Sequence, residues 1–444
     1  TALSFLCAGC LPITEQIPPI HSIFASAEDE EIVTSGTCGE NLTWEFDQET
    51  GILTISGTGA MENYLLNSPW SSNSDIKEMI IEDGVTAIGS YAFKDCTALE
   101  SITIPDSVTT VRGSAFSGTP WLKTKQNENP FVIINGILID GTTCAGEIMI
   151  PDSVTAIEGF AFNSCKSLTS ITIPDSVTAI GSYAFNDCTA LESITIPDSV
   201  TTIGASTFKN TPWLETKQNE NPLVIINGFL IDGTTCEGEI MIPDSVTTIG
   251  EFAFNYCHAL ESITIPDSVT AIEDSAFWCC DALESITIPD SVTTIEDSAF
   301  YYCTALESIT IPDSVTTIGT GAFESCTALK SITIPDSVTT IGKYAFARCY
   351  DLESVTISDS VTTIGESAFY SNYGKTTIYG YENSTAQAYA EKYEINFVSL
   401  GTAPEILTGD ANKDGVFNIS DIITIQKWLL NKGDLPNWKA VDFN

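Results

Sequence analysis

The sequence is poor in histidine and in basic residues. Its 444 residues include two His, and 17 Lys plus Arg stand against 59 Asp plus Glu, for a formal net charge of −42. The sequence therefore offers few histidine side chains for catalysis or for zinc binding. The acidic balance argues against nucleic acid, whose phosphates bind basic surfaces, and against anionic membrane surfaces. It fits a soluble, secreted, self-repelling monomer.

Long apolar runs are also missing beyond the N-terminal region, so no membrane span is expected. The opening stretch TALSFLCAGCL is apolar, and Ala25-Ser26-Ala27 precedes the acidic run EDEE. This order is typical of part of a secretory signal followed by its cleavage site. We expect residues 1–27 to be a signal-peptide remnant and the protein to be extracellular. A lipoprotein cleavage site at Leu6–Cys10 is less favoured, because Cys7 stands where leucine is usual.

One phrase recurs along most of the chain with a constant period. Residues 260–282 read LESITIPDSVTAIEDSAFWCCDA, and the phrase starts again at Leu283, after 23 residues. A period of this length is the signature of a leucine-rich-repeat solenoid. The proline of the phrase falls at Pro105, Pro151, Pro174, Pro197, Pro243, Pro266, Pro289, Pro312 and Pro335.

Each unit predicts a strand followed by a turn. Leu260, Ile263 and Ile265 alternate with polar residues, so one face of the strand is buried, and Pro266 ends it. The apolar residues that follow recur at three- to four-residue spacing, which predicts a short helical segment on the convex side. The expected fold is an α/β-repeat solenoid of about 13 coils. The helical segment would contain Val269, Ile272, Ala276 and Phe277.

The ends of the repeat region predict caps. Strand-like stretches flank the turn from Asp47 to Gly51, and we expect residues 28–75 to form an N-terminal β cap; a separate binding domain is the less favoured alternative. Residues 76–399 would be the solenoid, closing with a cap that contains a helix over Ser384–Tyr393. Residues 400–408 are expected to be a linker.

The phrase breaks twice in the same way, at Thr119–Pro151 and at Thr211–Pro243. The two blocks begin 92 residues apart, four periods, and each contains an Asn-Gly hairpin signal between apolar runs. Each break replaces the convex part of one coil and the strand of the next. We interpret both as variant coils. The alternative is a pair of protruding hairpins that present Trp121, Lys123, Lys125, Trp213 and Lys217 to a partner.

Two other residue types recur at one position of the repeat. A cysteine column predicts buried free thiols that bond loop backbone, with disulfides as the alternative in a secreted protein. The Asp of each IPD phrase predicts a solvated row of turn residues, with a calcium-collecting edge as the less favoured alternative. Exposed strand positions give a hydroxyl face with an acidic rim. The cysteines are Cys96, Cys165, Cys188, Cys257, Cys280, Cys303, Cys326 and Cys349.

The phrase L-x-S-I-T-I-P-D-S-V-T-x-I-G-x-x-A-F-x-x-C resembles the BspA-like leucine-rich-repeat family, over about residues 76–399. Members are mostly cell-surface or secreted binding and adhesion proteins. The resemblance implies such a role here, with an unknown protein or cell-surface ligand for the repeats. It transfers no catalytic residues.

A calcium-loop pattern lies near the C-terminus. Oxygen-bearing residues occupy positions 1, 3, 5, 9 and 12 of a twelve-residue loop, Gly415 stands at position 6, and position 7 supplies a carbonyl. This pattern predicts a Ca²⁺ site, although position 12 is the short Asp421 rather than Glu. The ligands would be Asp410, Asn412, Asp414, Val416, Asn418 and Asp421.

Residues 409–444 resemble a type I dockerin, the EF-hand-like cellulosome module that binds a cohesin domain. Asp442 and Asn444 match the first and third positions of a second loop, at which this sequence ends after one complete loop. By position, the resemblance implies cohesin contacts at Ile419, Ser420, Gln426 and Lys427.

The sequence therefore predicts a secreted, non-enzymatic solenoid, associated with a cellulosome, that docks through calcium to the cohesin of a scaffoldin. A stand-alone adhesin with a vestigial dockerin is the alternative. A dockerin-borne polysaccharide-degrading enzyme is less favoured, because no domain-sized stretch remains for a catalytic pocket.

Overall fold

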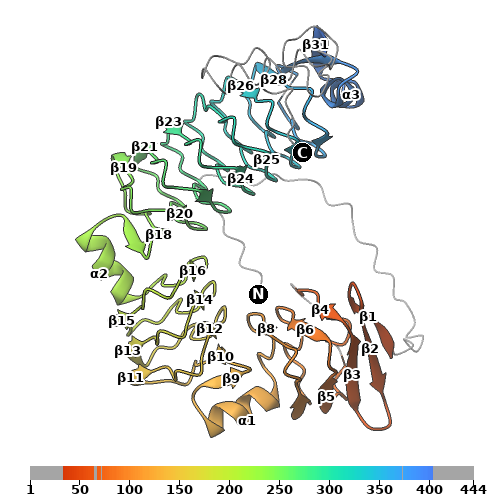
Figure 1. Cartoon of the computed structure of the whole chain (residues 1–444), viewed down its shortest axis with the longest axis vertical. Coiled ribbons are helices and arrows are strands. Elements are labelled where there is room, and N and C mark those ends of the chain that lie inside the picture. The colour runs from red at the N-terminus through yellow and green to blue at the C-terminus, as the bar shows by residue number, and fades with distance from the viewer. Residues whose placement is uncertain (1–33, 65–67, 72, 373, 404–444) are drawn as a thin grey trace, which may run out of the picture.

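The computed structural model describes residues 34–64, 68–71, 73–372 and 374–403. They form a β-solenoid of about 15 turns, close to the 13 coils expected from the repeat. The coils follow one another along an open arc (Figure 1). The predicted signal remnant, most of the linker and the whole dockerin-like segment lie outside the described residues.

One side of each regular coil is the predicted strand, and we call the series of these strands the long-strand ladder. Ile263 and Ile286 are cross-strand partners one coil apart and parallel, with their side chains buried, whereas Thr264 and Thr287 are exposed. In Figure 1 these strands follow the outer edge of the arc. Its sheets are β1(Ser35–Gly39)-β2(Leu42–Asp47)-β3(Ile52–Gly57)-β5(Glu78–Ile81)-β7(Ser101–Thr103), β11(Gly146–Met149)-β13(Leu168–Thr172)-β15(Ser193–Thr195), β19(Gly238–Met241)-β21(Leu260–Thr264)-β23(Ser285–Thr287) and β26(Ser331–Ile334)-β28(Ser354–Ile357)-β30(Thr377–Glu382)-β31(Asn396–Thr402).

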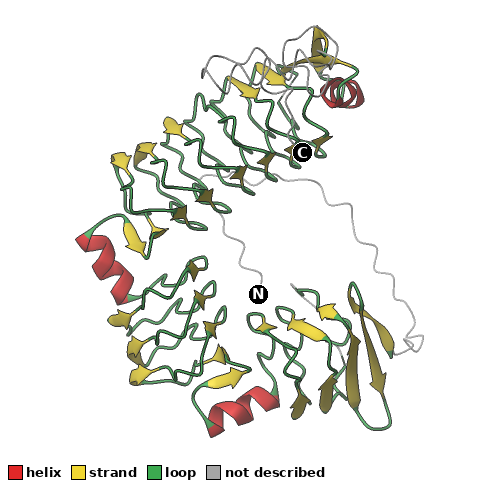
Figure 2. Cartoon of the chain, viewed as in Figure 1, coloured by secondary structure: helices red, strands yellow, loops and turns green. Residues whose placement is uncertain are grey.

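A second ladder of short strands lies on the inner side of the arc (Figure 2). In most regular coils it consists of two residues, one of them a buried isoleucine such as Ile272. Its sheets are β4(Gly59–Ala60)-β6(Val85–Ile88)-β8(Thr110–Val111), β16(Thr202–Ile203)-β14(Ala179–Ile180)-β12(Ala156–Ile157)-β10(Ile137–Asp140)-β9(Val132–Ile134), β17(Val224–Ile226)-β18(Phe229–Asp232)-β20(Thr248–Ile249)-β22(Ala271–Ile272) and β24(Thr294–Ile295)-β25(Thr317–Ile318)-β27(Thr340–Ile341)-β29(Thr363–Ile364).

The predicted helical segment over Val269 to Phe277 is wrong. After β22 the chain makes a tight turn over residues 273–280, in which Ser275 and Cys279 are left-handed, with φ of 55° and 59°. Left-handed residues at this spacing cannot continue a right-handed helix. The amides point along the solenoid instead: Phe277 N donates to Ala299 O of the next coil at 2.8 Å. We call this segment of every regular coil its tight turn.

The core contains a column of phenyl rings, one from each tight turn. Phe277, Phe300, Phe323 and Phe346 stack with centroids 5.3 Å apart and planes within 8°. All four side chains are buried. Offset aromatic pairs add about 0.5–1.5 kcal/mol each to the hydrophobic term, so this column ties neighbouring coils together.

The predicted column of buried free thiols is confirmed. Cys303 Sγ donates to Phe277 O, and Cys326 Sγ to Phe300 O, each at 3.2 Å. Burial raises the pKa of the Cys326 thiol to about 12. In the last coil the same position is Asn372, whose Nδ2 donates to Phe346 O at 3.2 Å. The thiols therefore serve the loop backbone as an asparagine does.

Both ends of the described solenoid carry structure of the predicted kind. The hairpin around Asp47–Gly51 is confirmed: β2 and β3 pair antiparallel, and β3 begins the parallel ladder by pairing with β5. At the other end, helix α3 (Thr385–Lys392) begins at its N-cap Ser384. Strand β31 follows and runs to Thr402, into the segment expected to be a linker.

Candidate functional site

The phenyl column and both ladders are interrupted where the sequence phrase breaks. Helix α1 (Pro120–Glu128) occupies a position at which the repeat would place a long strand. Thr119 is its N-cap, accepting from Leu122 N at 3.1 Å, and proline is tolerated at the next position because that amide needs no intrahelical partner. Trp121 N donates to Leu99 O of the preceding coil at 2.9 Å. The second break forms helix α2 (Pro212–Glu220) in the same way.

Each helix leads into the predicted Asn-Gly hairpin, β9–β10 and β17–β18. Asn135 and Gly136 have φ of 48° and 83°, as a tight hairpin turn requires. The Asn135 amide donates to Pro105 O and Val108 O, at 2.9 and 2.8 Å, and so ties the turn to the preceding coil. These hairpins are part of the solenoid, which confirms the variant-coil interpretation.

The alternative, in which the tryptophans are presented to a partner, is wrong. Trp121 and Trp213 are 8% and 7% exposed. Their rings contact Phe116 and Phe208, with centroids 4.8 and 4.7 Å apart, and cover the end of the phenyl column at each break. The nearby lysines stay at the surface, where Lys125 and Lys217 pair with Glu128 and Glu220.

A half-buried carboxylate holds each helix to its hairpin. Asp140 Oδ1 accepts from Gln126 Nε2 at 2.9 Å and from Thr142 Oγ1 at 3.0 Å, while Oδ2 has no hydrogen-bond partner among the described residues. Burial raises the pKa of Asp140, and these hydrogen bonds partly offset the increase. The equivalent residues at the second break are Gln218, Asp232 and Thr234.

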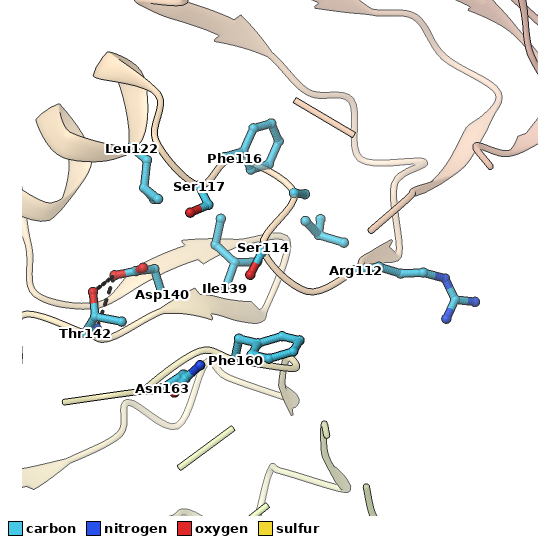
Figure 3. Close-up of a pocket in the computed structure, with 12 residues that line it drawn as sticks. Arg112, Ser114, Phe116, Ser117, Leu122, Ile139, Asp140, Thr142, Phe160 and Asn163 are labelled. Atoms are coloured by element: carbon cyan, nitrogen blue, oxygen red, sulfur yellow. Dashed lines mark hydrogen bonds between the residues drawn. The ribbon is translucent and has the colours of Figure 1, made fainter. Parts of the chain in front are cut away.

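A cavity lies beside each network. The first measures about 170 Å³ and the second about 260 Å³. In Figure 3, Ser117, Leu122 and Ile139 lie on one side of the first cavity, with Phe160 and Asn163 across it. Residues of the second wall that match the first at a 92-residue offset are Ser206, Phe208, Leu214, Ile231, Asp232, Thr234, Phe252 and Asn255.

One wall of each cavity is the tight turn that precedes the break. In regular coils the amide of the tight-turn phenylalanine donates to the next coil, as Phe162 N does to Ala184 O at 2.8 Å. Before a break, no tight turn follows in that place. Among the described residues, Phe116 N and Phe208 N have no hydrogen-bond partner, although both residues are only 2% exposed. Ser114 N and Ser206 N, in half-buried residues, also have no hydrogen-bond partner among the described residues.

The ends of the solenoid differ from the breaks in this respect. In the last tight turn, Phe369 N donates to Tyr389 Oη of helix α3 at 3.4 Å. In the first, Ala92 O accepts from Trp70 Nε1 at 3.0 Å. Side chains thus serve the free backbone groups at both ends, whereas the donors at the two breaks belong to residues that line the cavities and have no partner among the described residues.

A groove of about 480 Å³ next to the second break carries carboxylates. It is lined by Glu251, Glu273, Asp274 and Glu296. Burial, and then the charges of Asp274 and Glu273, raise the pKa of Glu251 to about 7. In the described part of the chain, no group of three or more His, Cys, Asp or Glu is arranged to hold a metal ion.

The predicted Asp row is confirmed as exposed, for example at Asp175 and Asp267. The cross-coil bonds at this turn come from the adjacent serine: Ser176 Oγ donates to Val154 O at 2.6 Å. The predicted hydroxyl face with its acidic rim is also present, and Glu261 and Glu284 are exposed beside it.

Comparison with known proteins identifies the repeat. A family model described as the BspA type leucine-rich-repeat region matches residues 67–138, 133–258, 232–339 and 293–402. The chain belongs to the BspA-type leucine-rich-repeat family. No curated protein matches the sequence.

Solved structures of this kind are similar to the chain. A leucine-rich-repeat protein from Bacteroides ovatus is 24% identical, covering 82% of this chain and 99% of its own, with a TM-score of 0.37. One from Eubacterium ventriosum is 25% identical, covering 78% and 95%, with a TM-score of 0.33. A leucine-rich cell-surface protein from Faecalibacterium prausnitzii is 27% identical, covering 81% and 97%, with a TM-score of 0.35.

The predicted calcium ligands Asp410 to Asp421, the second-loop residues and the cohesin contacts all lie outside the described residues. In the described ranges, no helix has the length and apolar character of a membrane span. The sequence prediction missed the two cavities. Their signal was present in the identical spacing of Gln126, Asp140 and Thr142 and of their counterparts 92 residues later.

Proposed function

We propose that this protein is a secreted, non-catalytic binding protein. Its BspA-type repeats bind a protein or surface ligand, and its C-terminal segment binds Ca²⁺ and docks to a cohesin domain on a scaffoldin.

The observation that carries the binding role is the extended exposed face of the long-strand ladder. Thr264, Thr287 and Thr310 project from successive coils, with exposed Glu261 and Glu284 beside them. Such a broad polar face suits contact with a large partner. The family supports this role, because its members are typically secreted or at the cell surface.

The docking role is supported by the sequence of the C-terminal segment alone. The loop from Asp410 to Asp421 carries oxygen ligands at the positions that Ca²⁺ requires, and an apolar helix-like stretch follows it. Because Ca²⁺ would order this loop, cohesin binding should require the ion.

A pull-down of the full chain with a panel of cohesin domains tests this role. Binding in the presence of Ca²⁺ should disappear with chelator and in the double variant Asp410→Ala/Asp414→Ala. Asp434→Ala, outside the loop positions, serves as the matched control. Binding that survives the chelator would contradict calcium-dependent docking.

The stand-alone adhesin remains the second candidate, favoured by the cell-surface relative from F. prausnitzii. It predicts adhesion to a cell or matrix surface that is unchanged by Asp410→Ala/Asp414→Ala. For the third candidate, an enzyme, hydrolysis assays on glycan, ester and peptide substrates should be blank, and reproducible turnover would overturn the non-catalytic assignment.

A further inference from the structure

We infer that the two cavities beside α1 and α2 are a matched pair of carbohydrate-binding sites, each taking one sugar residue. This inference rests on the proposed binding role of the repeats and is independent of calcium-dependent docking.

Each cavity wall contains a backbone N–H donor that has no acceptor. Phe116 N and Phe208 N lie in residues that are 2% exposed and have no partner among the described residues. A buried donor without an acceptor costs about 1–3 kcal/mol. In regular coils the same amide points along the solenoid at a carbonyl of the next coil, so here it points into the cavity. Each site therefore favours a ligand that has a hydrogen-bond acceptor.

The cavity walls also contain hydrogen-bond acceptors that have no donor. Asp140 directs all its hydrogen bonds to Oδ1, so Oδ2 is free to accept from a ligand. In the second cavity Asn255 Oδ1 is buried and has no partner. A ligand must then donate as well as accept. The carboxylate of Asp140 also disfavours an anion in the first cavity, because like charges repel.

Each cavity wall also has an apolar part, which includes a phenyl ring. Phe160 and Phe252 line the two cavities at equivalent positions and are half-buried. A phenyl ring beside a few convergent polar groups is the usual composition of a small-molecule site. A sugar residue matches it, since its hydroxyls both donate and accept while the C–H face of its ring packs on an aromatic side chain.

The two cavities are small, and the second repeats the first along the chain. Volumes of about 170 and 260 Å³ lie below the ~300–1,000 Å³ of sites for drug-sized ligands, so each holds a single ring. The walls repeat at a 92-residue offset, with Arg112, Ala115 and Ser117 in the first replaced by Gly204, Thr207 and Lys209 in the second. Two such sites on one rigid solenoid would raise the avidity for a glycan chain or a glycosylated surface.

The test uses the full chain and the methyl glycosides of glucose, galactose, mannose and N-acetylglucosamine. Saturation-transfer NMR identifies a bound glycoside, and calorimetry gives its stoichiometry. We expect two sites per chain for at least one glycoside, with affinity in the millimolar range.

The blocking variant is Ser117→Tyr/Lys209→Tyr. Regular coils already carry Tyr301 and Tyr370 at this position of the tight turn, so the fold accepts tyrosine there. The ring would fill the cavity and should weaken binding by more than about tenfold. Ser117→Tyr alone should lower the stoichiometry from two sites to one. Asn186→Tyr, at the same repeat position in a regular coil, is the matched control and should bind like the parent.

Three results would overturn the inference. In the first, none of the glycosides shows transfer at about 10 mM, which corresponds to affinities too weak for function and means that the cavities hold only ordered water. In the second, the double tyrosine variant, folded by circular dichroism, binds as well as the parent. In the third, an extended peptide competes for the cavities and the glycosides do not. Cohesin pull-down with the same variants should be unchanged, which separates failure of this site from failure of docking.

Discussion

In a regular coil the tight turn is bonded on both sides, whereas the turn before each break is bonded on one side only. Phe300 stacks between Phe277 and Phe323, and its amide donates to Ala322 O at 2.8 Å. Phe116 also has aromatic neighbours on both sides, Phe93 and Trp121, but its amide has no partner among the described residues. At the breaks, therefore, a tryptophan ring covers the exposed end of the phenyl column, whereas no group of the described residues replaces the lost hydrogen bond.

The largest expected effect tests the shared apolar column. Phe300→Ala should lower the free energy of unfolding by about 3–5 kcal/mol, because it leaves a cavity between two rings. Phe116→Ala should cost the same within about 1 kcal/mol, since Trp121 replaces the missing ring. Urea unfolding followed by circular dichroism measures both. A much smaller loss at Phe116 would mean that the column is weakened at the break.

The next effect concerns the acidic groove that borders the second break. Glu251 has a folded-state pKa of about 7, raised by burial and by Asp274 and Glu273, whereas the ordinary value is 4.5. Below pH 4.5 the group is protonated in both states. As pH rises from about 4.5 to 7, the unfolded state loses this proton while the folded state keeps it, so stability falls until the folded group also ionises.

Glu251→Gln should therefore stabilise the fold at pH 8 by on the order of 1–3 kcal/mol, and the gain should vanish at pH 4. Thermal unfolding at both pH values gives the comparison, with the exposed Glu261→Gln as the control. An equal gain at both pH values would show that packing, and not titration, is responsible.

An effect of similar size tests the polar network that belongs only to the breaks. Gln218→Ala removes a donor to the half-buried Asp232, and should cost about 1–3 kcal/mol. Asn219→Ala, at an exposed position of the same helix, should change stability by less than about 0.5 kcal/mol. Chemical denaturation distinguishes them, and equal values would mean that the network does not hold α2 in place.

The smallest effect tests the thiol column within the regular coils. Asn372 accepts from Cys349 N at 3.1 Å as well as donating to Phe346 O, whereas a thiol at that position would mainly donate. Asn372→Cys should thus cost about 1 kcal/mol. Differential scanning calorimetry can resolve the change, and unchanged or increased stability would mean that the bond from Cys349 N to Asn372 contributes nothing.

Much of the solenoid could be predicted from residue pattern. The strand of Leu260, Ile263 and Ile265 follows from alternation, the hairpins follow from Asn135-Gly136 and its copy, and the buried thiols follow from one cysteine per period. These features depend on local pattern repeated in register, which the sequence displays directly.

The tight turns and the breaks were harder to predict, for physical reasons. Spacing at three to four residues fits a helix equally well, and only the left-handed backbone at positions such as Ser275 excludes it. For α1, the signal was present in Thr119-Pro120, an N-cap followed by proline, but it falls where the period demands a strand. The unpaired amide of Phe116 has no sequence signal, because it arises from what the following coil lacks.

The raised pKa of the buried thiols has a practical consequence. A thiol reacts as its thiolate, so Cys188 and Cys326, with pKa values of about 12, should resist alkylation while their coils stay closed. Reaction then requires the coil around the cysteine to open. In variants that keep a single cysteine, the labelling rate would report how often that one coil opens, and so would map local stability along the arc without any added probe.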